Sequence, residues 1–354
     1  MDLNIWLPFP SAIVTFVFAV LVFRRYRRRG GTYLLLWGVG LVMYGIGSIS
    51  EAFTTALGWN PLVFRAWYFF GAMLVAAWLG QGTVHLLWKR WSRPLLILLA
   101  VGSLFGLYRI ATAQIDPIML AEDVTSVSAV GDFDEQEVAT LAAAAIQTTA
   151  LNRNGELDAR RFSPLASTLV SYAKAAGVTL PEATPIEVDG ANVKATVAGK
   201  TVLLGHPAWL ADQGVAVTSA SETQLIVAVD GEPAGSLGLE LGRELHGHAI
   251  VSPGVRVLTP LFNIYGTLAL AGGAIYSAWI FLRKRIMPNR VIGNVLIATG
   301  ALMPAIGGTL SRFGLGGYLY LGELLGAILM FIGFLQATAH APERRTVPTT
   351  ETVT

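Results

Sequence analysis

The chain has 354 residues, of which 53% are hydrophobic and 14% charged, and its mean hydropathy is +0.56. Soluble globular chains carry about 25% charged residues, so this composition favours a lipid bilayer as the solvent. The net charge of +2 is too small to favour a nucleic acid as a partner. Because the chain has no cysteine, a disulfide scaffold, a zinc–thiolate site, an iron–sulfur cluster and a thiol nucleophile are excluded.

Seven apolar stretches are long enough to cross a bilayer core, which needs about 20 residues of helix. The first lacks a basic leading segment and a small-residue cleavage site, so we expect it to be a retained span rather than a signal peptide. Tryptophan and tyrosine lie near several ends, as in the aromatic belts of membrane proteins. In chain order the predicted spans are residues 5–23, 33–52, 63–88, 94–110, 257–282, 291–310 and 318–339.

Basic residues are concentrated in the loops that would share one side of the membrane. They follow the first, third, fifth and seventh predicted spans, at residues 24–29, 89–93, 283–290 and 344–345. The positive-inside rule therefore predicts an N-terminus outside and a C-terminus inside a bacterial plasma membrane. It places the segment between the fourth and fifth spans outside. Anionic lipid head groups are the expected partners of the basic inner loops.

The long segment between the fourth and fifth spans has the pattern of a folded α/β domain. Residues 134–149 and 164–176 have helical signals, including Ser163 as a cap before Pro164. Strand-like runs follow at residues 193–197, 201–204, 225–229 and 234–239, and Asp230-Gly231 between the last two predicts a hairpin. We therefore predict a membrane all-α protein: a seven-transmembrane-helix bundle with an inserted α/β soluble domain, an antiparallel sheet plus helices, between spans 4 and 5.

The predicted domain boundaries follow from these patterns. Residues 1–116 hold the first four spans, residues 117–250 form the insert, and residues 251–341 hold the last three spans. The tail of residues 342–354 is rich in threonine and proline, and we expect it to be disordered.

The order of elements in the insert resembles the nucleotide-binding domain, or N-domain, of heavy-metal-transporting P-type ATPases. The similar region covers residues 122–241, about a third of the chain. The matching segments are FDEQEVATLAAAA from Phe133, SPLASTLVSYAKAAGVTLPE from Ser163, VKATVAGKTVLLGHPAWLADQGV from Val193 and LIVAVDGEPAGSLGLE from Leu225. The resemblance implies the N-domain fold for this region.

The resemblance also implies a nucleotide pocket in which most contacts are replaced. The family's His-Pro pair, whose histidine packs on adenine, corresponds here to Ser163-Pro164. A family glutamate a few residues upstream falls near Asp158. The family's Gly-x-Gly turn appears as Gly190-Ala191-Asn192, and a family asparagine that follows a glycine appears as His206 after Gly205. These residues form the predicted pocket remnant.

The other parts of a P-type ATPase are missing from the sequence. We find no Asp-Lys-Thr-Gly-Thr phosphorylation motif, no actuator Thr-Gly-Glu, no Cys-Pro-Cys metal site and no Gly-Asp-Gly loop for magnesium. Without the aspartyl nucleophile, the ion-pumping mechanism of that family is excluded. A seven-span protein that acquired the insert, by natural fusion or by construction, accounts for this pattern. Deleting about residues 121–242 would leave a short loop.

Ionisable groups within membrane spans are costly and often functional. Glu51, Arg65, Arg312 and Glu323 all fall toward the predicted outer side, and a cluster of them is geometrically possible. It would be either a substrate or proton site that opens outward, or a structural ion pair between helix ends. No catalytic residue and no metal site is expected.

Four further polar residues lie within predicted spans. Gln81 and His85 share one face of the third span, and Asn294 in the sixth span is predicted at a similar depth. A proton relay or a haem ligand is one interpretation. Hydrogen bonding between helices is the other, and it extends to Asn263 in the fifth span.

The favoured interpretation is a membrane protein whose insert is a non-catalytic binding, sensing or structural module. The membrane part is similar to bacterial seven-span proteins of uncharacterised function, a resemblance that implies no activity. No cofactor is expected, and ATP would be available only to a cytoplasmic insert. The alternatives are a nucleotide-responsive membrane protein with a cytoplasmic insert, and a secondary transporter.

Overall fold

The structure of the chain is a computed structural model. It describes residues 6–338 except 152–155, 157–162, 218–222, 243–244, 253, 286 and 313–317. The chain divides into two compact units, which are described separately. The first comprises residues 1–45, 74–100 and 262–354, and the second comprises residues 46–73 and 101–261.

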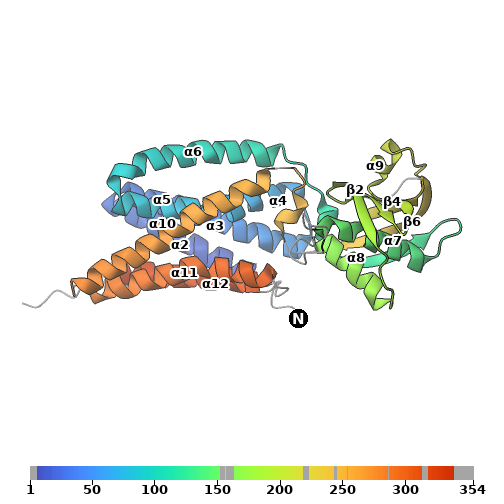
Figure 1. The fold of residues 1–354 in the computed structure, drawn as a ribbon. Helices are drawn as coiled ribbons and strands as arrows, with labels where there is room; N and C mark the ends of the chain where they lie inside the picture. Colours follow the sequence, from blue (N-terminus) through green and yellow to red (C-terminus); the bar gives the residue numbers. More distant parts are fainter. Residues whose placement is uncertain are drawn as a thin grey trace, which may run out of the picture. The chain divides into compact units, whose positions relative to one another are not determined.

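The described part of the chain has seven helical segments that are long and apolar enough to cross a membrane, which confirms the seven predicted spans. The third is continuous but is composed of α4 (Pro61–Ala66), the π-helix η1 (Trp67–Leu74) and α5 (Val75–Leu87). The other six are α2 (Pro8–Arg29), α3 (Thr32–Leu57), α6 (Lys89–Ala111), α10 (Val255–Arg283), α11 (Pro288–Arg312) and α12 (Tyr318–Thr338) (Figure 1).

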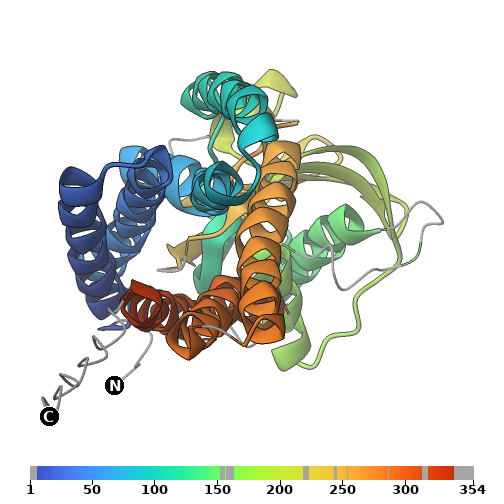
Figure 2. The ribbon, with the colours of Figure 1, turned by 90° about the vertical axis from the view of Figure 1, so that its left-hand side faces the viewer.

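Local sequence signals set several of the helix ends. The side chain of Asn60 accepts hydrogen bonds from the backbone N–H groups of Leu62 and Val63, at 2.9 and 3.2 Å, and so caps α4. Gly30 ends α2 with a φ of 67°, and its N–H bonds to the carbonyl of Tyr26 at 2.7 Å. In the first unit, α11 packs along α12, and α12 also packs against α2 (Figure 2).

In the second unit, the π-helix η1 crosses α3 at a close backbone contact. A Cβ atom built on Gly47 would lie 2.8 Å from the Cα of Gly71, and one built on Gly71 would lie 2.9 Å from the Cα of Gly47. Real Cβ atoms do not approach other atoms so closely, so only glycine fits at both positions. Small residues of this kind allow membrane helices to approach each other.

The insert contains a six-stranded antiparallel sheet in the order β1-β6-β5-β4-β3-β2. This confirms the predicted α/β insert between the fourth and fifth spans. The strands are β1 (Ala121–Ala129), β2 (Ala183–Asp189), β3 (Asn192–Val197), β4 (Lys200–Gly205), β5 (Gln224–Val229) and β6 (Glu232–Leu241). Between β5 and β6, Asp230 and Gly231 both have positive φ, which is the hairpin geometry predicted from the Asp-Gly pair.

One face of the sheet is covered by two helices, and a short helix packs on part of the other face. Helices α7 (Glu135–Gln147) and α8 (Pro164–Ala175) bury Leu141, Leu165 and other apolar side chains against one face. The short helix α9 (Pro207–Asp212) packs with Leu203 and Ile226 on the other. Because successive strand residues point to opposite faces, the apolar runs of β4 and β5 supply both cores.

The two ends of the insert are joined by a pair of linkers, residues 114–116 and 249–252, here called the stalk. Ile115 and Ile250 form an antiparallel bridge. The N–H of Asp116 bonds to the carbonyl of Ala249 at 2.8 Å, and the N–H of Val251 bonds to the carbonyl of Gln114 at 3.2 Å. The insert therefore leaves α6 and returns to α10 through two hydrogen-bonded strands.

Candidate functional site

Four residues of the predicted pocket remnant lie together at one end of the sheet. Gly190 lies in the turn between β2 and β3, Asn192 begins β3, Gly205 ends β4, and His206 precedes α9. The side-chain oxygen of Asn192 accepts a hydrogen bond from the backbone N–H of His206 at 2.9 Å. A Cβ on Gly205 would lie only 2.5 Å from that oxygen, so the close approach of β3 and β4 requires glycine there.

His206 is bound to the stalk rather than left open to a ligand. Its Nε2 lies 3.0 Å from Oδ2 of Asp116, while Oδ1 of Asp116 accepts the backbone N–H of Ile118 at 3.1 Å. The hydrogen bond to Asp116 raises the pKa of His206 above its usual value, and partial burial of the imidazole opposes that effect. Protonation of His206 therefore strengthens its contact with the stalk.

Gly190 also faces the stalk. A Cβ built on Gly190 would lie 3.0 and 3.1 Å from the two methyl groups of Val251, and 3.7 Å from Oδ2 of Asp116. Both linkers of the stalk thus contact the remnant, one through Asp116 and the other through Val251. This side of the remnant is closed by the chain itself.

The remaining remnant residues have a local structural role or lie outside the described residues. Ser163 is buried, and its hydroxyl accepts the backbone N–H of Ala166 at 3.1 Å, which caps α8 at Pro164. Asp158 lies outside the described residues.

In the second unit, the two charged membrane candidates have separate partners. Glu51 is buried in α3, and its Oε1 accepts the indole N–H of Trp67 at 2.8 Å. Arg65 donates from its guanidinium to the carbonyls of Ile110 and Ala113, the latter at 3.0 Å. Those carbonyls are at the C-terminal end of α6, where a cation is favoured by the helix dipole. Arg65 therefore ties the start of the third span to the end of the fourth.

In the first unit, Gln81 joins three segments by hydrogen bonds. Its amide N–H donates to the carbonyl of Ser92 at 2.7 Å, and its amide oxygen accepts the hydroxyl of Tyr265. Gln81 is fully buried. These hydrogen bonds join α5 to α6 and to α10. They agree with the interpretation of Gln81 as a residue that hydrogen-bonds between helices, because a buried amide that binds two helices stabilises their packing.

The other candidates in the first unit are spread over several helices. Asn294 donates to the hydroxyl of Ser277 at 2.8 Å, which joins α11 to α10. The backbone carbonyl of Glu323 accepts the hydroxyl of Tyr44 at 2.7 Å. His85 and Asn263 are half-buried in α5 and α10. The side chain of Arg312 lies outside the described part of the chain.

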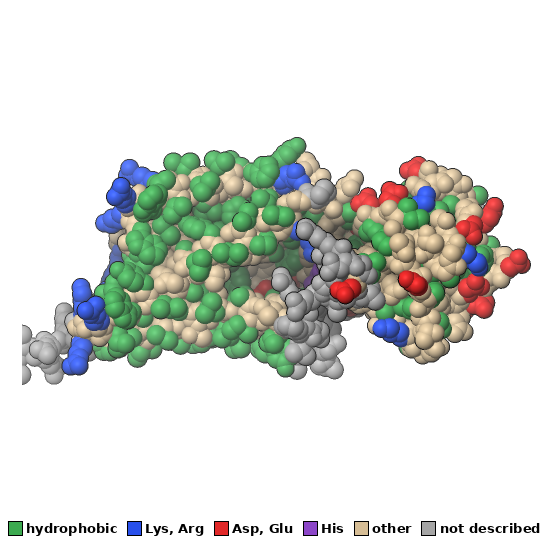
Figure 3. All heavy atoms as spheres, viewed as in Figure 1, with side chains coloured by type: hydrophobic (Ala, Val, Ile, Leu, Met, Phe, Trp, Pro, Cys, Tyr) green, Lys and Arg blue, Asp and Glu red, His purple; other side chains and the backbone are tan. Residues whose placement is uncertain are grey.

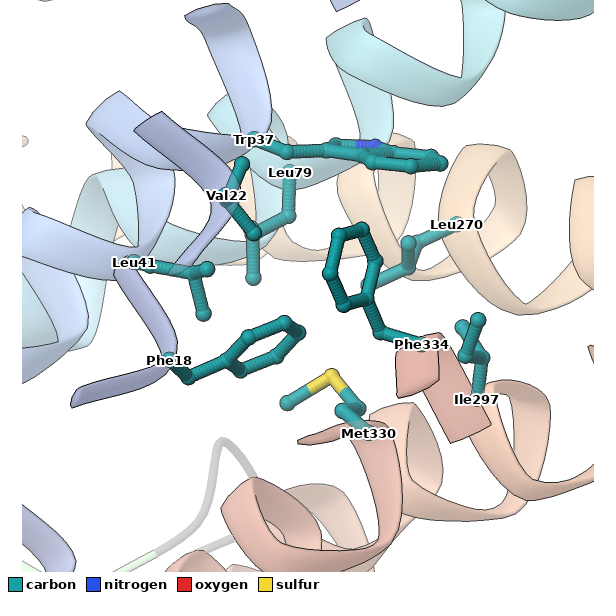
Figure 4. A pocket seen from close by; sticks show the side chains of 9 residues that line it. All are labelled: Phe18, Val22, Trp37, Leu41, Leu79, Leu270, Ile297, Met330 and Phe334. Atoms are coloured by element: carbon teal, nitrogen blue, oxygen red, sulfur yellow. The ribbon is translucent and has the colours of Figure 1, made fainter. Parts of the chain in front are cut away.

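An apolar cavity lies among the helices of the first unit. Nine apolar side chains surround it, and the rings of Phe18, Trp37 and Phe334 and the sulfur of Met330 point into it (Figure 4). Its volume is about 30 Å³. A space this small with an apolar lining offers a water molecule no hydrogen-bond partner, so we expect it to stay dry. The cavity is therefore a packing feature that has no room for a porphyrin.

The stalk is the part of the candidate site that the sequence does not reveal. Asp116 precedes a proline, which predicts a local turn, but nothing in the sequence pairs it with His206, 90 positions later. A second feature found only in the structure is a polar groove of about 390 Å³ between β1 and α8. Glu122, Asp123 and the hydroxyl-bearing side chains of α8 surround it.

The similarities found between this chain and known proteins concern the insert only. No protein-family model matches the chain, and no curated protein matches it. Among solved structures, the N-domain of HMA6, a copper-transporting P-type ATPase, is similar at 26% identity and a TM-score of 0.27. The N-domain of HMA8, also a copper-transporting P-type ATPase, is similar at 23% identity and a TM-score of 0.26. Each similarity covers 33% of this chain, and 96% and 98% of the respective domain. The described part of the chain is that of a membrane-helix protein with an inserted α/β domain.

Proposed function

We propose that the chain is an integral membrane protein whose insert is a non-catalytic binding, sensing or structural module. One observation carries this proposal: the stalk covers the pocket remnant, through the 3.0 Å contact between His206 and Asp116 and the packing of Val251 on Gly190. A nucleotide would have to displace Asp116, whose negative charge also repels phosphate. The missing phosphorylation motif supports the same conclusion.

A nucleotide titration of the full-length protein in detergent tests this proposal. We expect ATP, with and without magnesium, to bind more weakly than about 1 mM, which corresponds to about 4 kcal/mol of binding free energy. The matched variant Ser163→His restores the histidine before Pro164 and should bind no better, because the stalk remains in place. Binding of ATP by the wild type below 1 mM, or by Ser163→His alone, would contradict the closed pocket.

We also propose that the protein spans a bacterial plasma membrane with its N-terminus and insert outside and its basic loops inside. The distribution of lysine and arginine supports this orientation. On the inner side, the proposed partners of the basic loops are the head groups of anionic lipids, whose negative charge attracts polybasic segments. The insert would then face a compartment with little ATP.

The absence of cysteine makes the orientation simple to measure. Glu232→Cys places a thiol at the exposed first residue of β6 in the insert, and Lys284→Cys places one in the exposed basic loop after α10. On intact cells, a membrane-impermeant maleimide should label Glu232→Cys at once and Lys284→Cys only after lysis. The wild type serves as the unlabelled control. The reverse labelling pattern would place the insert in the cytoplasm and favour the nucleotide-responsive alternative.

A further inference from the structure

The basic loops form one end of the helices of the first unit, where lysine and arginine side chains gather (Figure 3). Residues 24–29, 89–93 and 283–290 contain no aspartate or glutamate. The positive charge of this end is therefore not balanced by carboxylates within these segments.

Arg25 differs from its neighbours in this end of α2. It is half-buried, whereas Arg24, Arg27 and Arg28 are exposed. Its guanidinium carbon lies 5.9 Å from the ring centroid of Phe334 in α12, which is within the range of a cation–π contact. This contact draws the Arg25 side chain toward α12.

Two further arginines, Arg29 and Arg290, lie on the same end of the first unit as Arg25. Arg29 follows Arg25 by four residues on α2, so the two lie on the same face of that helix. A Cβ built on Gly293 of α11 would lie 2.6 Å from the carbonyl oxygen of Gly333, next to Phe334 in α12, so the start of α11 lies beside the ring that Arg25 contacts. The guanidinium of Arg290 lies 5.5 Å from the ring centroid of Phe281. Arg290 is also in the first turn of α11, which begins at Pro288, and the N-terminus of a helix favours an anion. Like charges repel more strongly near a low-dielectric surface, so this arrangement favours a bound anion.

We propose that Arg25, Arg29 and Arg290 form a head-group site for one anionic phospholipid. Planar guanidinium groups match the oxygens of a phosphate and bind them through paired hydrogen bonds. The apolar cavity beside Phe334 is too small, at about 30 Å³, for an acyl chain, so the chains stay in the bilayer. This inference deepens the proposed contact with anionic lipids and rests on it.

Native mass spectrometry of the full-length protein tests the site. Dioleoyl-phosphatidylglycerol and dioleoyl-phosphatidylcholine are titrated separately, and the dissociation constant of the first bound lipid is measured. Arg25→Gln should weaken binding of the first phosphatidylglycerol about tenfold, since it removes charge-assisted hydrogen bonds. Arg290→Gln, on a different helix, should weaken binding of the first phosphatidylglycerol to a similar extent. It replaces Arg25→Gln as the test if that variant does not fold. The matched control Arg28→Gln, at an exposed position of α2, should change it less than about twofold.

The outcomes of this experiment distinguish the proposed head-group site from a non-specific attraction of the basic loops to anionic lipid. Equal weakening by Arg25→Gln and Arg28→Gln would overturn the site and leave the proposed lipid contact standing. A wild type that binds both lipids equally would overturn both. Inorganic phosphate should not displace the first phosphatidylglycerol, because the lipid is also held by its chains. Displacement by phosphate would identify a free-phosphate site and overturn the proposal.

Discussion

Gly266→Ala is expected to destabilise the helical unit by about 3 kcal/mol or to prevent its folding, the upper range for overpacking a well-packed contact. A methyl group at Gly266 of α10 would overlap the backbone carbonyl of Ala76 and the backbone nitrogen of Ala77 in the third span. At the same crossing, a Cβ on Gly80 of the third span would lie 2.7 Å from the carbonyl oxygen of Gly266. Backbone atoms cannot rotate away, so the two helices would have to separate.

Gly272→Ala is the matched control on the same helix. A Cβ there would meet no atom within 4 Å, and the position is exposed. Alanine is favoured over glycine in a helix by about 1 kcal/mol in water, so this variant should be as stable as the wild type or slightly more so. Unfolding of both variants in detergent, followed by circular dichroism, measures the difference. Equal stabilities of the two variants would show that α10 and the third span do not cross at Gly266.

Deletion of residues 121–242 is expected to leave seven helices that insert and fold. The two ends of the deleted segment already meet, because the N–H of Gly242 bonds to the carbonyl of Leu120 at 2.8 Å and Ala121 pairs with Leu241. The joined chain therefore needs no rearrangement of the stalk. The insert also has its own apolar core, so its removal exposes little of the helical part.

The control is an equally long deletion of residues 113–234, which removes one strand of the stalk and leaves most of β6. We expect this variant to be degraded, because the unpaired strands expose their backbone groups. Membrane-fraction yield and size-exclusion profiles in detergent compare the two. If both deletions abolish the folded protein, the insert is required for folding of the spans and is not a separable module.

The helices were predictable because the bilayer imposes a long apolar signal on each span. Strands β3 to β6 were also predicted, since they are buried and their turns contain glycine. Strand β1 was missed because two irregularities in its pairing with β6 break the alternation of apolar and polar residues. Strand β2 was missed because it is an exposed edge strand that includes Pro185.

The candidate site was predictable only in part. The sequence identifies Gly190, Asn192, Gly205 and His206 through a resemblance, and the structure brings these four together. The sequence alone could not show that Asp116 reaches His206, because a contact across 90 positions leaves no local pattern. The π-helix η1 was missed for a related reason: its apolar residues are equally compatible with an α-helix, and the hydrogen bonds that distinguish the two leave no composition signal.

The stalk has a mechanical consequence for the insert. A domain on two independent linkers can rotate freely, and a ligand bound to such a domain exerts no torque on the membrane helices to which the linkers lead. Here Ile115 and Ile250 fasten the linkers to each other, and Arg65 fastens the end of α6 immediately before them. Tilting the insert therefore moves both linkers together, so a force applied to the soluble domain reaches the end of α6 and the segment before α10 at once.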